Sequence, residues 1–183
     1  MISMKRAVFF CFALAAMVAF AAASAHAKGG RVALTGDKMA LLQQINSHVN
    51  ATITEVSDME LYGKADVWAL PVNGKGDCED FALLKRKMLV ERGWAASSLS
   101  ITVGVTPSGE AHAWLTVATD RGDYVLDNLR SSVMLTEQTG YRTYSRQGGG
   151  KGWVSASGEQ TSEPTADFAI AGVGPARVAS RRR

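Results

Sequence analysis

Two helical patterns precede three consecutive strand patterns in this sequence, and that order restricts the fold more than any other feature. Apolar residues recur at three- and four-residue steps over residues 37–51 and again over 78–92, which predicts two amphipathic helices. Apolar and polar residues then alternate over 101–105, 112–119 and 124–129, with turn residues between these segments. Because short turns join antiparallel neighbours, the sequence predicts an α+β domain with helices packed on an antiparallel sheet.

The second predicted helix has clear start and stop signals. Asp77 stands at the N-cap position, Asp80 approximates a capping box, and Gly93 follows as the stop. Cys78 therefore falls in the first turn. The segment before this helix, 52–73, has no periodic pattern and is expected to be a long irregular loop. The basic residues of the helix are expected to face mostly water: Lys85, Arg86 and Lys87.

The N-terminus has the pattern of a cleaved export signal. Lys5 and Arg6 precede the apolar stretch 7–23, and Ala25-His26-Ala27 fits the small-x-small rule for cleavage. We predict that residues 1–27 are a signal peptide, and that the product is periplasmic in a cell with two membranes and has no membrane span. The alternative is a retained membrane anchor, because the apolar stretch is near the lower limit of spanning length.

The formal net charge of +3 comes from the two ends of the chain. Without the signal and the stretch after Trp153, acidic and basic residues balance in number. A neutral body lacks the positive surface that phosphate backbones need, so nucleic acid is excluded as a partner. Residues 154–183 have no periodic apolar pattern, and we predict a disordered tail after a domain at 28–153.

Signal cleavage leaves one cysteine, Cys78, and two histidines, His48 and His112. A single thiol cannot form an intramolecular disulfide, and in an oxidising compartment it is prone to oxidation. We therefore expect Cys78 to be either catalytic or buried and inert. His48 lies at the edge of the apolar stripe of the first helix and is interpreted as a partly buried residue with a hydrogen-bond partner.

The residues beside Cys78 act on its thiol in opposite directions. A helix N-terminus lowers the pKa of a thiol, which favours Cys78 as a nucleophile. Asp77 and Glu79 oppose this effect, because neighbouring negative charges raise a thiol pKa. A Ca²⁺ ion bound by these two carboxylates would remove that charge. The other interpretation is that both acids simply favour the positive end of the helix dipole.

His112 begins the second predicted strand, and Asp127 lies near the end of the third on the same face of the sheet. If the end residues of the turn 120–123 pair, Asp127 faces Thr116 and lies about 13 Å from His112, too far for a hydrogen bond. Asn128 is a second candidate for orienting the His112 ring, because an amide oxygen can accept a hydrogen bond. The alternative is a core thiol and a strand-end imidazole without a catalytic role.

Three blocks carry a family resemblance: 74–82 (GKGDCEDFA), 112–115 (HAWL) and 125–129 (VLDNL). In this order, they make the chain from about residue 44 to 153 resemble the bacterial transglutaminase-like cysteine proteinases. The resemblance implies a papain-like or transglutaminase-like α+β fold, with Cys78 as nucleophile, His112 as general base and acid, and Asp127 as the residue that orients His112. Further matches lie upstream: Tyr62-Gly63, Asp66, Trp68 and Pro71.

Characterised members of that family are periplasmic, calcium-dependent proteases that cut a large surface adhesin near its N-terminus. An inner-membrane cyclic-di-GMP receptor holds them inactive. The resemblance therefore implies an adhesin-like protein substrate, such a receptor as partner, and Asp77 and Glu79 as calcium ligands. Trp114 is larger than the residue expected in its block, and the C-terminal tail has no family counterpart; neither departure touches the three implied catalytic positions.

The implied reaction is attack of the Cys78 thiolate on a carbonyl, proton donation by His112 to the leaving amine, and hydrolysis of the resulting thioester. The backbone N–H of Cys78 is the expected oxyanion donor, with Trp68 and Asn73 as candidates for the second. Two alternatives stay open at this point. One is acyl transfer to an amine, as in transglutaminases, and the other is a non-catalytic periplasmic module that binds calcium.

Overall fold

The computed structural model describes residues 30–148 and 152–161. The predicted signal peptide, 1–27, and residues 162–183 of the predicted tail lie outside the described residues. None of the helices in the described ranges is long and apolar enough to cross a membrane. The described residues therefore cover most of the predicted domain and the first part of the predicted tail.

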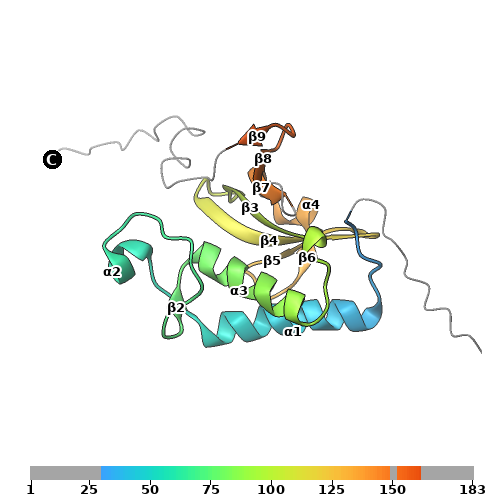
Figure 1. Cartoon of the computed structure of the whole chain (residues 1–183), viewed down its shortest axis with the longest axis horizontal. Helices are drawn as coiled ribbons and strands as arrows, with labels where there is room; N and C mark the ends of the chain where they lie inside the picture. The colour runs from blue at the N-terminus through green and yellow to red at the C-terminus, as the bar shows by residue number, and fades with distance from the viewer. Residues whose placement is uncertain (1–29, 149–151, 162–183) are drawn as a thin grey trace, which may run out of the picture.

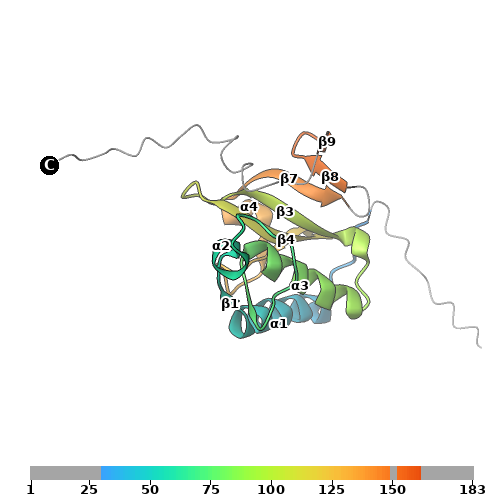
Figure 2. The same ribbon diagram turned by 60° about the vertical axis from the view of Figure 1, so that its left-hand side comes forward.

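Both predicted helices are present, and their ends differ from the prediction by at most one residue. Helix α1 spans Gly36–Thr52 and begins after Thr35, whose hydroxyl accepts a hydrogen bond from the backbone N–H of Lys38. Helix α3 spans Cys78–Glu91, and Gly93 follows it with a φ of 84°, a left-handed conformation that glycine adopts without strain. Both views of the ribbon place α1 and α3 on the same side of the sheet (Figures 1 and 2).

The three predicted strands are consecutive antiparallel neighbours, as expected. They are β3 (Leu99–Val105), β4 (Ala111–Thr119) and β5 (Gly122–Leu126), and the sheet order is β6-β5-β4-β3-β7-β8-β9. The sequence did not predict the outer strands, which are β6 (Met134–Leu135), β7 (Arg142–Gly148), β8 (Gly152–Ser155) and β9 (Gln160–Thr161). The sheet therefore continues past the predicted domain end at residue 153.

The segment predicted to be irregular contains short elements. Strand β1 (Thr54–Glu55) pairs in parallel with β2 (Lys75–Gly76), and helix α2 (Asp58–Tyr62) lies between them in the chain. In Figure 1 this segment lies near the N-terminal end of α3. Two further short helices are η1 (Ala96–Ser98) and α4 (Thr136–Thr139).

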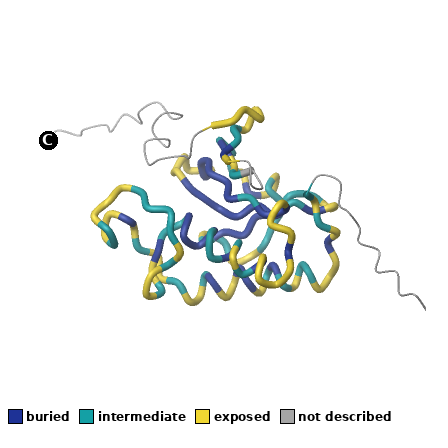
Figure 3. The backbone as a smooth tube through the Cα atoms, in the orientation of Figure 1, coloured by how far each residue is buried: buried dark blue, intermediate teal, exposed yellow. Residues whose placement is uncertain are grey.

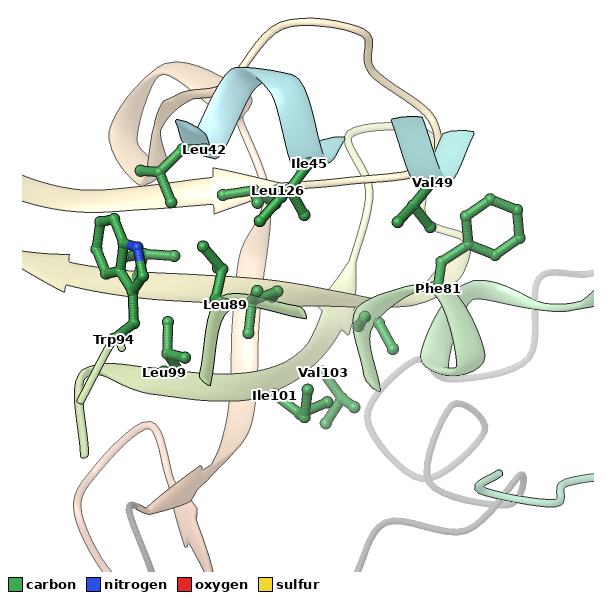
Figure 4. Close-up of a cluster of buried hydrophobic side chains, with 14 of the residues drawn as sticks. Leu42, Ile45, Val49, Phe81, Leu89, Trp94, Leu99, Ile101, Val103 and Leu126 are labelled. Atoms are coloured by element: carbon green, nitrogen blue, oxygen red, sulfur yellow. The ribbon is translucent and has the colours of Figure 1, made fainter. Parts of the chain in front are cut away.

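The hydrophobic core lies between the two long helices and the sheet (Figures 3 and 4). Burying each large apolar side chain contributes about 1.5–3 kcal/mol relative to leaving it exposed. The core therefore fixes α3, and with it the position of Cys78, against β4. The side chains that meet there include Leu42, Ile45 and Val49 from α1, Phe81 and Leu89 from α3, and Ile101, Val103 and Leu126 from the sheet.

Lys85 corrects one prediction for α3. Its side chain is 0% exposed, whereas Lys87 faces water as expected. The reason is helical periodicity: Lys85 follows Phe81 and precedes Leu89 by four residues each, so it lies in the buried stripe. Burial lowers the pKa of Lys85 to about 7.

Candidate active site

Cys78 is the first residue of α3, and its half-buried thiol lies against β4. The thiol donates a hydrogen bond to Oε2 of Glu79 at 3.2 Å, and the backbone N–H of Ala113 donates to the sulfur. Ala113 directly follows His112, so the thiol lies beside the strand segment that carries His112. Burial, followed by the negative charge of Glu79, raises the pKa of Cys78 well above its usual range.

His112 and Asp127 form a buried pair. The ring nitrogen Nε2 of His112 lies 2.7 Å from Oδ1 of Asp127, and the two side chains are 4% and 1% exposed. Although burial acts to raise it, hydrogen bonding and the charge of His112 hold the pKa of Asp127 below its ordinary value. Asp127 is therefore an ionised partner that fixes the orientation of the ring.

The strand register explains how this pair forms and corrects the predicted spacing. Thr119 pairs with Gly122, so the turn contains only residues 120–121, and Leu115 pairs with Leu126. The next residue, Asp127, therefore lies beside Trp114 instead of Thr116. It is thus two residues closer to His112 than predicted and still on the same face.

The two other polar residues considered at this site lie elsewhere. Asn128 donates a hydrogen bond from Nδ2 to Oε2 of Glu55 at 3.3 Å, which directs its amide away from the role of orienting His112. His48 is exposed on α1, so the prediction of a partly buried residue is wrong. Of the candidate partners for His112, the structure selects Asp127.

Asp127 has further partners that the sequence did not indicate. The Tyr141 hydroxyl donates a short hydrogen bond to Oδ2, and the backbone N–H of Leu129 donates to Oδ1 at 3.1 Å. The Asp127 backbone N–H donates to Oδ1 of Asn46 on α1 at 2.9 Å, and Asn50 donates to the Asp127 carbonyl at 2.8 Å. Burial and the hydrogen bond to Asp127 raise the pKa of Tyr141 to about 12, so the phenol keeps its proton.

Five carboxylates gather around the start of α3, and we call them the acidic cluster. Two overlapping groups have oxygen atoms within 4.8 Å of one another: Asp58, Asp66 and Glu79, and Asp58, Asp77 and Asp80. The predicted ligands Asp77 and Glu79 belong to different groups, and Asp58 belongs to both. Sequence reasoning missed Asp58, Asp66 and Asp80, and the only local signal was the density of acids in the segment leading to α3.

The electrostatics of the acidic cluster match those of a cation site. Burial, then Asp77, raise the pKa of Glu79 to about 9, and burial raises that of Asp80 to about 7. Three buried oxygens have no hydrogen-bond partner among the described residues: Asp58 Oδ1, Asp77 Oδ1 and Asp80 Oδ2. Crowded buried carboxylates are stabilised by protons or by a hard cation, and Ca²⁺ takes six to eight oxygen ligands of this kind. The residues present therefore fit calcium.

Backbone and indole groups hold the acidic cluster in place. Val67 donates a short hydrogen bond to Asp58 Oδ2, and Ala69 donates to Asp80 Oδ1 at 3.1 Å. The indole N–H of Trp68 donates to Asp66 Oδ2 at 3.1 Å, which commits this candidate oxyanion donor to the acidic cluster. The other candidate, Asn73, is exposed and has a φ of 54°.

Comparisons with known proteins give the family and a similar fold. The family model described as bacterial transglutaminase-like cysteine proteinase matches residues 8–161. The calcium-bound structure of Legionella pneumophila LapG is 26% identical, with a TM-score of 0.56, covering 68% of this chain and 72% of that chain. A further LapG structure is also 26% identical, with a TM-score of 0.54 and coverages of 64% and 68%. No curated protein matches the chain.

The family match extends over all of the described residues and ends at the last residue of β9. The fold likeness to LapG agrees with the mixed arrangement of helices and antiparallel sheet described above. On both grounds, the chain belongs to the bacterial transglutaminase-like cysteine proteinases and is a cysteine protease.

Proposed function

We propose that the protein hydrolyses a peptide bond with Cys78 as nucleophile, His112 as general base and acid, and Asp127 as the group that orients His112. The observation that carries this proposal is the buried 2.7 Å contact between His112 and Asp127, one residue from the Ala113 N–H that touches the Cys78 sulfur. Since Asp127 engages Nε2, the other ring nitrogen, Nδ1, serves the thiol. A nucleophile, a base and an orienting group are the parts that covalent acyl transfer needs.

The reaction follows from these roles. His112 takes the proton of the Cys78 thiol as the sulfur attacks the substrate carbonyl carbon, and the negative charge moves to the carbonyl oxygen. The backbone N–H of Cys78, in the first turn of α3 and without an intrahelical acceptor, stabilises that oxygen. His112 then gives its proton to the departing amine, which leaves a thioester. Water, deprotonated by His112, releases the acid product and restores the thiol.

We also propose that the acidic cluster binds calcium. When bound, Ca²⁺ would supply positive charge that neutralises Asp77 and Glu79 and so favours the thiolate of the neighbouring Cys78. The unpartnered buried oxygens of the cluster support this, and a similar protein, LapG, has a calcium-bound structure. The residues that would hold the ion are Asp58, Asp66, Asp77, Glu79 and Asp80.

A Cys78→Ala variant tests the catalytic proposal. We expect hydrolysis of labelled protein substrates to fall at least about a thousandfold, because the nucleophile is absent. His48→Ala, an exposed change on α1, is the matched control and should retain parent activity. Parent-level hydrolysis by Cys78→Ala would contradict the mechanism. Adding a primary amine to the parent reaction distinguishes hydrolysis from acyl transfer, since a transglutaminase would form the amide product.

Thermal unfolding of chelator-treated protein tests the calcium proposal. We expect Ca²⁺ to raise the Tm, because an ion at about 100 times its Kd stabilises the folded state by about 2.7 kcal/mol. Asp58→Asn should abolish this rise, since Asp58 belongs to both ligand groups. Asp37→Asn, at the exposed start of α1, should retain it. An unchanged Tm of the parent on addition of Ca²⁺ would refute the site.

We further propose export, with removal of residues 1–27 and activity in the periplasm on a large surface adhesin, under control of an inner-membrane cyclic-di-GMP receptor. The basic, apolar and small-residue pattern of the N-terminus and the family membership support this setting. N-terminal sequencing of the protein recovered from a periplasmic fraction should give Lys28 as the first residue. Recovery of the intact N-terminus from the cytoplasmic fraction would contradict it.

A further inference from the structure

Tyr141 contacts both members of the His112 and Asp127 pair. Its hydroxyl donates to Oδ2 of Asp127, while His112 engages Oδ1 of the same carboxylate. The Tyr141 ring lies edge-on to the His112 ring, with centroids 5.7 Å apart, and packs 4.9 Å from Trp114. The two carboxylate oxygens of Asp127 therefore each have a dedicated side-chain partner.

Arg130 determines which way the Tyr141 proton points. Its Nε donates to the Tyr141 hydroxyl oxygen at 3.2 Å, and its guanidinium lies 5.2 Å from the centre of the Tyr141 ring. A second donor, Nη2, holds the carbonyl of Thr139 at 3.1 Å. Because a guanidinium can only donate, the phenol oxygen accepts from Arg130 and must give its own proton to Asp127.

The charges around Asp127 come from several elements. His112 faces the Asp127 carboxylate from β4, and Arg130, which follows β5, places its Nε 4.0 Å from Oδ2. Lys85 on α3 interacts electrostatically with the same carboxylate. Helix α1 contributes only the uncharged Asn46 and Asn50. The carboxylate is thus surrounded by donors and cations, and Tyr141 is the side chain that holds the oxygen opposite His112.

We propose that Tyr141, oriented by Arg130, is a positioning residue for catalysis: it fixes the rotation of the Asp127 carboxylate and draws part of its negative charge away from His112. This inference rests on the proposed function of the same pair. Without the hydroxyl, Oδ2 loses its donor in a buried setting, and more charge is left to stabilise the imidazolium. An imidazolium held more tightly gives its proton to the leaving amine more slowly.

The test is Tyr141→Phe, with Tyr124→Phe as the matched control. Tyr124 lies on β5 and packs against the hydrophobic core. Tyr124→Phe therefore removes the same hydroxyl group at a position away from Asp127. In Tyr141→Phe we expect kcat to fall about tenfold with KM unchanged, and the alkaline limb of kcat to move up by roughly half to one pH unit. NMR of the His112 ring should show its titration moving in the same direction, without substrate present.

The outcomes separate this inference from the proposed function. An unchanged His112 titration in Tyr141→Phe would overturn the positioning role even if kcat fell, because a purely structural defect lowers activity without moving the ring equilibrium. Failure of the catalytic proposal is seen instead in Cys78→Ala, which leaves Tyr141 intact. If Tyr141→Phe does not fold, Arg130→Gln keeps the phenol but removes the donor that orients it, and should move the titration in the same direction by a smaller amount; no movement would equally overturn the role.

Discussion

The side chain of Asn46 joins helix α1 to the segment that carries Asp127. Its Oδ1 accepts from the Asp127 N–H and its Nδ2 donates to the Arg130 carbonyl, both at 2.9 Å, and the residue is 0% exposed. In Asn46→Ala the buried Asp127 N–H loses its partner, while the Arg130 carbonyl keeps a hydrogen bond from Asn50 at 3.1 Å, and we expect the free energy of unfolding to fall by about 2 kcal/mol. Urea denaturation measures this, with the exposed Ser47→Ala as control. A loss below about 1 kcal/mol would show that the hydrogen bonds of Asn46 contribute little to the stability of the fold.

Residue type alone identified two of the three residues of the proposed catalytic group. The third, Asp127, was predicted on the correct face of the sheet but too far from His112. Cys78 and His112 are the cysteine and one of two histidines left after the predicted cleavage, so chemistry alone singles them out. Asp127 depended on strand register, and the two-residue turn brought it closer than expected. Tyr141 had no sequence signal, because its contact with Asp127 depends on how the chain after α4 returns to the sheet.

Prediction from the sequence was also incomplete for the proposed calcium ligands of the acidic cluster. Asp77 and Glu79 were predicted because they flank Cys78 in the sequence. Asp58 and Asp66 come from the segment without a periodic pattern, and nothing local indicates that it folds back on the start of α3. Asp80 is close in sequence but was interpreted only as part of a helix cap, so it was missed as well. The two acids that flank the cysteine could thus be predicted, and those brought to it by tertiary contacts could not.

Helix α3 carries a buried amine as well as the proposed nucleophile. Burial lowers the pKa of Lys85 to about 7, while an unfolded chain keeps a lysine pKa of about 10.4. Between these values the unfolded chain binds more protons, so the free energy of unfolding rises with pH, by at most about 1.4 kcal/mol per pH unit. Glu79, whose pKa is raised to about 9, opposes this rise in both proteins, so the informative quantity is the difference between them. We expect the free energy of unfolding of the parent, relative to that of Lys85→Met, to rise from pH 7 to about 10, as measured by urea denaturation at several pH values.

Lys87 supplies the matched control for that experiment. Its side chain is 50% exposed and pairs with Glu91, so Lys87→Met should keep the pH dependence of the parent. If the curves of Lys85→Met and the parent run parallel from pH 7 to 10, Lys85 is not the group responsible. The sequence assigned Lys85 to the solvated face because lysine is rarely buried, although its four-residue spacing from Phe81 and Leu89 indicated the buried stripe.

The elements predicted correctly are those whose signals are local. Helices α1 and α3 have apolar periodicity and end signals within their own residues, and β3 to β5 alternate and are joined by short connections. Strand β7 pairs instead with the distant β3, and the ladder shifts between Val103 and Gly104. At Gly104 an added Cβ would lie 2.1 Å from the Arg142 carbonyl oxygen, so this close pairing depends on glycine. Such long-range pairing leaves little trace in a local pattern.

At the scale of the whole molecule, the last strands connect the sheet to the acidic cluster. Trp153 on β8 is 5% exposed and meets Trp68 edge-on, with ring centroids 5.1 Å apart. The indole N–H of Trp68 in turn donates to Asp66 of the acidic cluster. The C-terminal strands therefore support the segment that holds the proposed calcium ligands.

Two chains that differ only in their C-terminal end test this connection: one covering 28–161 and one covering 28–153, the domain predicted from the sequence. The shorter chain lacks Val154, which pairs with Arg146, and Ser155, which pairs with Ser145, and it also loses the 2.7 Å bond from the Ala156 N–H to the Tyr144 carbonyl. We expect its free energy of unfolding to be lower by roughly 2–3 kcal/mol, because each lost backbone hydrogen bond contributes about 1 kcal/mol. Urea denaturation measures this difference. The Tm rise on adding Ca²⁺ should also be smaller in the shorter chain. In that chain Trp153 is the last residue, so it no longer holds Trp68 firmly. Equal unfolding midpoints and equal calcium responses would place the end of the domain at Trp153 and show that residues 154–161 do not support the acidic cluster.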